Sequence, residues 1–254
     1  MANGETEIPA SQGLSPKVHV TPVAPIWHTV VFLVVFLGLS SFEGQAKFAA
    51  QAAQEPSRIP TYIVTIAYEF VLLGYVWLFG LRRYRISLGD LIGGNWRRWA
   101  DFWRDIGVAL LFWLVVGAVI YMCSRLLHFR GLDAAKGMLP QTSLEVGVYL
   151  VLSCCAGFCE EVLFRGYLQR QFIAWTRSVA GGVALQAAVF GLGHLYQGGK
   201  AVLVISIYGA LFGILAAMRK SLRPGIMQHV ANDALGGVVG RLATKYKYLQ
   251  IIKF

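Results

Sequence analysis

The run Cys159-Glu160-Glu161-Val162-Leu163-Phe164-Arg165-Gly166 places two carboxylates and a guanidinium in a segment that otherwise has the composition of a membrane span. Apolar residues from Val146 to Cys159 lead into this run. A charge at the centre of a membrane helix costs roughly 2.5–3.5 kcal/mol on insertion scales. Three charges within one such segment therefore indicate a functional site.

The spacing of these charges divides them into a pair and a single acid. Glu161 and Arg165 are four residues apart, so they share a helix face and can pair with each other. Glu160 points about 100° away from Glu161 and has no such partner on its own helix. We therefore expect Glu160 to be the acid that is free for chemistry.

Two later apolar segments each carry a histidine, His194 and His229. His229 and Asp233 are four apart, so the carboxylate could orient the imidazole. Gly191 and Gly193 leave space beside His194, either for close approach of another helix or for a ligand.

A carboxylate and two histidines in an apolar cavity support two kinds of chemistry. A glutamate can take a proton from water that attacks a carbonyl, while other polar groups stabilise the oxyanion. Alternatively, two histidines with one or two glutamates could hold a divalent metal, although no local HExxH motif is present. Purely structural roles are the competing interpretation. Structural roles alone do not account for the occurrence of six such residues together, namely Glu160, Glu161, Arg165, His194, His229 and Asp233.

The composition fits a multi-spanning membrane protein. Of 254 residues, 56% are hydrophobic and 14% are charged, and the mean hydropathy is +0.57. The net charge of +10 lies in short loops between apolar runs, which favours membrane topology over nucleic-acid binding. The four cysteines lie in apolar segments and form no disulfide framework. They are expected to be small buried residues, with a nucleophilic Cys159 as a minor alternative.

The sequence predicts an all-α fold, a polytopic membrane bundle of about seven to eight transmembrane helices around a buried polar catalytic chamber. The positive-inside rule places the arginine-rich loops and the N-terminus in the cytoplasm. The basic C-terminal end disagrees with seven crossings, so an eighth crossing or a non-crossing last segment is expected. The predicted apolar segments are Ile26–Phe42, Thr61–Leu81, Ile106–Ser124, Val146–Gln169, Val179–Tyr196, Ala201–Met218 and Pro224–Leu242.

The chain is predicted to have four parts. These are a flexible polar tail (1–25), N-terminal membrane helices (26–144) with a basic interfacial segment (82–104), a catalytic membrane domain (145–242) and a basic tail (243–254). Trp96, Trp99 and Trp103 follow helical spacing, which suits either a short interfacial helix or core packing. Glu69 is a lone acid within an apolar segment, either facing the protein interior or pairing with a distant base.

Three motifs in this order resemble the CPBP family, the CAAX-protease and bacteriocin-processing group of intramembrane proteases, also called Abi. They are Glu160-Glu161-x-x-x-Arg165, Phe190-x-x-x-His194 and His229-x-x-x-Asp233. The resemblance covers about residues 145–242, and its specificity lies in the three motifs taken together. It implies an all-helical membrane endopeptidase of the glutamic type.

The resemblance also implies roles for individual residues. Glu160 with His194 would activate water, and His229 with the residue at 233 would form the oxyanion site. Glu161 and Arg165 would brace the first motif. The last motif position is often Asn in the family, whereas here it is Asp233 and follows Asn232. An ionised Asp233 could not donate a hydrogen bond to the oxyanion, so either Asp233 is protonated or Asn232 is the donor. The third alternative, which we favour, is that Asp233 orients His229.

The leading interpretation is a protease of the plasma membrane that needs no cofactor. Zinc is the minority alternative. Its partners would be membrane lipids and a membrane-associated peptide or protein, such as a CAAX-type tail or a leader peptide, and not nucleic acid. A non-catalytic peptide-binding or bacteriocin-immunity protein is the rival from another class. A small-solute or proton transporter comes third, because Glu and His also form proton relays.

Overall fold

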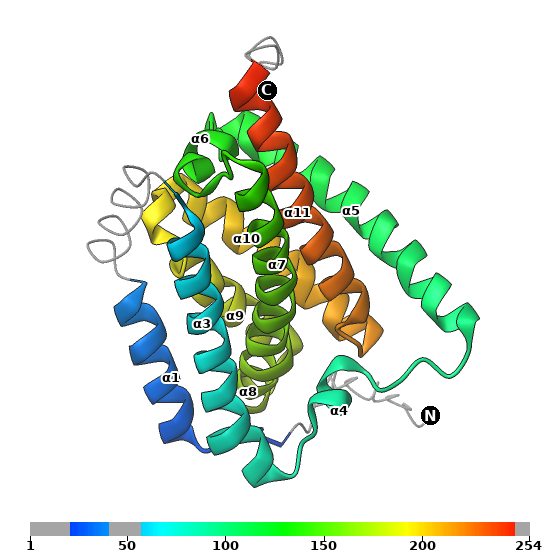
Figure 1. Cartoon of the computed structure of the whole chain (residues 1–254). Coiled ribbons are helices and arrows are strands. Elements are labelled where there is room, and N and C mark those ends of the chain that lie inside the picture. Colours follow the sequence, from blue (N-terminus) through cyan, green and yellow to red (C-terminus); the bar gives the residue numbers. More distant parts are fainter. Residues whose placement is uncertain (1–20, 41–56, 247–254) are drawn as a thin grey trace, which may run out of the picture.

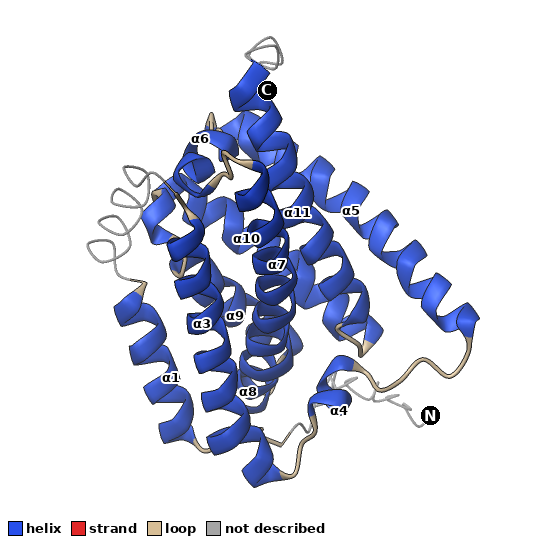
Figure 2. Cartoon of the chain, viewed as in Figure 1, coloured by secondary structure: helices blue, strands red, loops and turns tan. Residues whose placement is uncertain are grey.

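The computed structural model describes residues 21–40 and 57–246, and within these ranges the chain is helical with no strand (Figure 2). Every predicted apolar segment carries a helix, so the all-α bundle is confirmed. The α-helices are α1 (Ile26–Leu39), α3 (Ile59–Tyr75), α4 (Leu88–Ile92), α5 (Trp99–Leu127), α6 (Gly131–Ala135), α7 (Ser143–Glu160), α8 (Gln169–Thr176), α9 (Val179–Leu192), α10 (Gly199–Arg219) and α11 (Arg223–Tyr246). Short π- and 3₁₀-helices are η1 (Val76–Gly80), η2 (Leu81–Tyr84), η3 (Lys136–Met138), η4 (Glu161–Leu168) and η5 (Leu195–Gln197).

Four helical stretches are long and apolar enough to cross a bilayer, namely Ile59–Tyr84, Trp99–Leu127, Ser143–Thr176 and Gly199–Arg219. The apolar helices α1 and α9 are shorter, at 14 residues each. Many large apolar side chains of α5 are exposed, for example Leu111 at 65% and Leu114 at 62%. Such a surface is stable in lipid rather than in water, so this is an integral membrane protein.

The continuous run α7–η4–α8 lies at the centre of the bundle (Figure 1). Helices α3 and α11 both pack against α7, and α9 packs between α8 and α10. Helix α5 lies along α11 and α10 at the edge of the bundle (Figure 1). The helix that carries the first motif is therefore surrounded by those that carry the other two.

The N-terminal segment begins to pack earlier than the predicted tail boundary at residue 25. Val23 and Ala24 are buried, and the Gln171 side chain of α8 binds their backbone. Its Oε1 accepts from both amides at 2.9 and 3.2 Å, and its Nε2 donates to the Ala24 carbonyl at 2.8 Å. Residues 1–20 of the tail, the end of the first apolar segment at 41–42 and residues 247–254 lie outside the described ranges.

The tryptophans of the basic segment do not form a separate short helix. Trp96 precedes α5, whereas Trp99 and Trp103 lie in its first turns. All three are exposed, Trp99 by 79%, so the alternative of core packing is also wrong. Exposed tryptophans beside arginines suit the headgroup level of a membrane.

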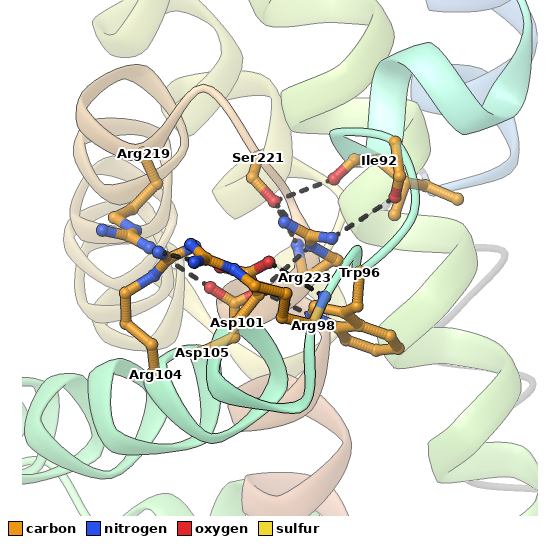
Figure 3. Close-up of polar contacts among 10 residues, drawn as sticks. Ile92, Trp96, Arg98, Asp101, Arg104, Asp105, Arg219, Ser221 and Arg223 are labelled. Carbon is orange, nitrogen blue, oxygen red and sulfur yellow. Dashed lines mark hydrogen bonds and ion pairs between the residues drawn. The ribbon is translucent and has the colours of Figure 1, made fainter.

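A buried carboxylate, Asp105, holds the basic end of the bundle together (Figure 3). It forms ion pairs with Arg219 at 3.2 Å and Arg223 at 3.0 Å, and it accepts a hydrogen bond from Trp96 Nε1 at 2.9 Å. Ser221 Oγ donates to the Ile92 carbonyl at 2.9 Å. The loop between α10 and α11 is thus fixed to α5 and to the end of α4.

Glycines allow α7 and α11 to touch. A Cβ at Gly157 would lie 2.7 Å from Val230 Cγ2 and 2.9 Å from the Val230 amide nitrogen. A Cβ at Gly147, on the same helix, would meet nothing within 4 Å. The close approach at Gly157 sets the distance between the first and third motifs.

These two glycines make a matched pair for a stability test. Gly157→Ala is expected to lower the melting temperature, because α11 must move away from α7. Gly147→Ala should leave it unchanged or raise it, since Ala in a helix interior is favoured over Gly by roughly 0.5–1 kcal/mol. Thermal unfolding of both variants in one detergent measures the difference. Equal melting temperatures would contradict the close contact.

Candidate active site

The first motif lies where α7 changes from an α-helix to a π-helix. Glu160 is the last residue of α7, and η4 runs from Glu161 to Leu168 with all eight of its residues buried. The sequence predicted one regular α-helix through this segment, which is wrong for η4. The pairing of Glu161 with Arg165 is nevertheless present, with Nη1 and Oε1 2.9 Å apart.

Arg165 is enclosed by groups that stabilise its charge. Its side chain is 0% exposed, and Nη2 donates to the Gly209 carbonyl of α10 at 3.3 Å. The guanidinium carbon lies 4.5 Å from the ring centroid of Phe190 and 5.1 Å from that of Phe212. A desolvated cation over aromatic faces gains about 2 kcal/mol or more.

The His229 imidazole is held by Glu161. Its Nδ1 lies 3.0 Å from Glu161 Oε1, the same oxygen that pairs with Arg165. The rings of Tyr208 and Phe212 meet the imidazole at centroid distances of 5.7 and 5.5 Å. The sequence interpretation limited Glu161 to bracing Arg165, so it missed this contact between helices.

The other nitrogen of His229 faces two acids. Nε2 lies 3.6 Å from Glu160 Oε2 and 3.7 Å from Asp233 Oδ2. Since the Glu161 carboxylate can only accept, the Nδ1 hydrogen is directed at it. A further proton must then lie on Nε2, Glu160 or Asp233, because three unprotonated acceptors would repel one another. Glu161, not the favoured Asp233, is the carboxylate nearest to His229.

His194 lies just beyond the end of α9, in the turn before η5. Its Nδ1 is 2.9 Å from the Phe190 carbonyl. A carbonyl only accepts, so this contact assigns the hydrogen to Nδ1 and leaves Nε2 as the basic nitrogen of the neutral ring. The short α9, which ends at Leu192, places His194 outside the helix.

The glycines beside His194 allow close packing of the helices. A Cβ at Gly191 would lie 2.6 Å from the Val202 carbonyl of α10, and one at Gly193 would lie 3.0 Å from Phe36 Cε1 of α1. Gly193 also lines a cavity, so it meets both expectations, whereas Gly191 meets that of close helix approach.

Glu160 and His194 line the same cavity, which has a volume of about 420 Å³. The cavity lies between α1, α3 and η4, and most of its wall is apolar. Burial raises the pKa of Tyr196, so its hydroxyl stays protonated and can donate. The lining residues are Phe36, Leu39, Ser40, Val64, Thr65, Tyr68, Glu69, Leu72, Met138, Glu160, Leu163, Phe164, Gly193, His194 and Tyr196.

Glu69 is a second acid in this cavity. It is 7% exposed, and its Oε2 has no hydrogen-bond partner among the described residues. Of its two predicted states, the structure shows the one in which it faces the protein interior. An unpaired acid in an apolar span was the signal that could have placed it in the site.

The predicted residues do not all reach the cavity. Glu160 and His194 line it, whereas His229 and Asp233 lie behind Glu160. Asn232 makes no hydrogen bond to His229 within the part of the chain that the structure describes. In the same ranges, no group of three or more His, Cys, Asp and Glu side chains is arranged to hold a metal ion.

Comparison with protein families bears on this site. The family model for type II CAAX prenyl endopeptidase, Rce1-like, matches residues 142–235. Residues 142–235 are thus similar to Rce1-like endopeptidases. They contain all three motifs, so the predicted resemblance to CAAX proteases is confirmed for this part of the chain. No curated protein and no solved structure matches the chain significantly.

The buried Glu161–Arg165 pair generates a test of its own. Arg165→Met should destabilise the fold by roughly 3–5 kcal/mol, because it leaves Glu161 buried and unpaired. The double variant Glu161→Gln/Arg165→Met should be less destabilised than Arg165→Met alone. Unfolding free energies in detergent measure both. A double variant as unstable as the sum of the single ones would contradict the pairing.

Proposed function

We propose that the protein is an intramembrane endopeptidase of the glutamic type, hydrolysing a peptide bond of a membrane-associated protein or peptide. The observation that carries the proposal is that Glu160 and His194 both line an apolar cavity inside an Rce1-like region. An acid and a basic nitrogen there can bind and activate one water molecule.

The cavity suits an extended apolar peptide. Its volume of about 420 Å³ lies within the usual range of ligand sites, roughly 300–1,000 Å³. Its walls come from α1 and α3, whose outer faces contact lipid. A CAAX-type tail or a leader peptide would enter with apolar side chains against Phe36 and Leu72 and its scissile carbonyl near Glu160.

In the proposed reaction, water lies between the Glu160 carboxylate and His194 Nε2. Glu160 takes a proton, and the water oxygen attacks the carbonyl carbon. The His229 imidazole, which the Glu161 contact on Nδ1 positions, lies 3.6 Å from Glu160 Oε2 and stabilises that carboxylate. The Tyr196 hydroxyl on the cavity wall donates to the oxyanion. Glu160 then returns its proton to the leaving nitrogen as the C–N bond breaks. No step requires a metal.

The proposal includes an orientation. Arginines collect around Asp105 at one end of the bundle (Figure 3), and the exposed Trp99 and Trp103 lie in the same first turns of α5. By the positive-inside rule, this end of the bundle lies at the cytoplasmic face of the cell membrane. The N-terminus is then cytoplasmic as well.

The proposed reaction predicts the effect of removing either member of the water-activating pair, Glu160 and His194. Glu160→Gln and His194→Ala are each expected to lower peptide cleavage by roughly 10²–10⁴-fold, since each removes a proton-transfer group. Cys154→Ser, at an exposed position on the same helix, should retain full cleavage. Mass spectrometry of a fluorogenic CAAX-type or leader-type peptide in proteoliposomes measures the products.

The same variants separate the protease from a peptide-binding protein. The peptide should bind to Glu160→Gln with unchanged affinity and remain uncut. If the wild-type protein also binds the peptide without cutting any member of a diverse library, the binding-protein alternative replaces the protease.

Chelation tests the zinc alternative directly. Treatment with EDTA or 1,10-phenanthroline followed by dialysis should leave cleavage unchanged, because the proposed water is activated by Glu160 and His194 alone. Loss of cleavage that one equivalent of zinc restores would show that a metal takes part.

A further inference from the structure

A second cavity, of about 290 Å³, lies at the basic end of the bundle. It is bounded by α4, by η4 and α8, and by the C-terminal end of α10. None of its lining residues contributes to the cavity of Glu160 and His194. They are Leu91, Arg165, Gln169, Arg170, Ile173, Ala216, Ala217, Lys220, Ser221 and Leu222.

The lining carries positive charge and no acid. Arg165 is matched by Glu161, but Arg170 and Lys220 form no ion pair with any described carboxylate. The acid whose charge acts on Arg170 is Asp90, which instead accepts a hydrogen bond from Ser87 Oγ at 2.7 Å. Two cations are therefore left without a partner beside one cavity.

Buried polar atoms at this cavity also lack partners. Arg165 is 2% exposed, and its Nε has no acceptor among the described residues. The Oε1 of Gln169, 3% exposed, likewise has no donor there. Both atoms are almost inaccessible behind the cavity wall, so the charged groups that a ligand in the cavity can meet are Arg170 and Lys220.

The position of the cavity adds an amphipathic character. Ser221 lines it and also lies beside Arg223 and Asp105, next to Trp96 (Figure 3). Leu91, Ile173 and Leu222 supply apolar wall next to the cations. Arginine and lysine together are the usual partners of phosphate oxygens.

We propose that this second cavity binds a phosphate group, carried either by an anionic membrane lipid or by a soluble phosphate. Arg170 and Lys220 supply the charge, and Leu91, Ile173 and Leu222 supply the apolar wall. The proposal concerns binding alone, so the result of its test does not depend on whether the protein is a protease.

The test uses the purified full chain in phosphatidylcholine nanodiscs. One arm titrates inorganic phosphate, with acetate at equal ionic strength as the reference. The other arm adds phosphatidic acid or phosphatidylglycerol to the nanodisc, and native mass spectrometry counts the retained lipid. Binding in the lipid arm alone identifies a headgroup site. Binding in both arms, with each ligand competing against the other, identifies a general phosphate site.

Variants locate the binding. Arg170→Gln/Lys220→Gln should weaken phosphate or lipid binding at least tenfold, whereas Arg177→Gln should leave it unchanged. Arg177 is a matched control, because Lys220 and Arg177 both follow a helix in the left-handed conformation, at φ of 49° and 53°. No binding in either arm, equal binding by the double variant, or an equal response to acetate would each overturn the proposal.

Discussion

The ion pair between Glu161 and Arg165 is the interaction on which the rest of the structure depends. Both side chains are almost fully buried within the central helical run. Neither charge could remain there alone, because an uncompensated buried charge costs several kcal/mol. Each is stabilised by more than its partner, since Arg165 also contacts the Gly209 carbonyl and two aromatic faces. Burying this pair therefore fixes α9 and α10 against η4.

The same pair brings the third motif into place. Glu161 Oε1 contacts both Arg165 and His229, so one oxygen joins η4 to α11. The imidazole is then held between the Glu161 carboxylate on one side and the two further acids on the other. Glu160 keeps its access to the cavity because its neighbour makes the structural contacts. The motif thus separates structural support from the proposed chemistry within two consecutive residues.

Local sequence rules predicted what lies within single helices. The seven helical segments, the i,i+4 pairing of Glu161 with Arg165 and the distinct direction of Glu160 all follow from apolar runs and helical spacing. The ends of the packed segments were predicted less closely, since Val23 and Ala24 are packed, α7 begins at Ser143, and α11 runs on to Tyr246.

Contacts between helices could not be predicted in this way. The distance from His229 to Glu161 depends on how closely α11 approaches α7, which Gly157 sets through its contact with Val230. The π-helical geometry of η4 depends on buried partners from several helices and leaves no mark in the apolar pattern. Glu69 lies in the site because tertiary packing places α3 across from Glu160.

The contact between Gly193 and Phe36 has a consequence for substrate range. The backbone beside His194 is pressed against α1 so closely that a single added carbon would not fit. The position of the Phe36 ring in the cavity wall is thus set by the bare backbone of Gly193. At the other walls, around Val64 and Met138, the width of the cavity depends on side-chain size. Changes of side-chain size at these two positions would therefore alter the bulk of the peptide that fits, while the Phe36 ring keeps its place beside Gly193.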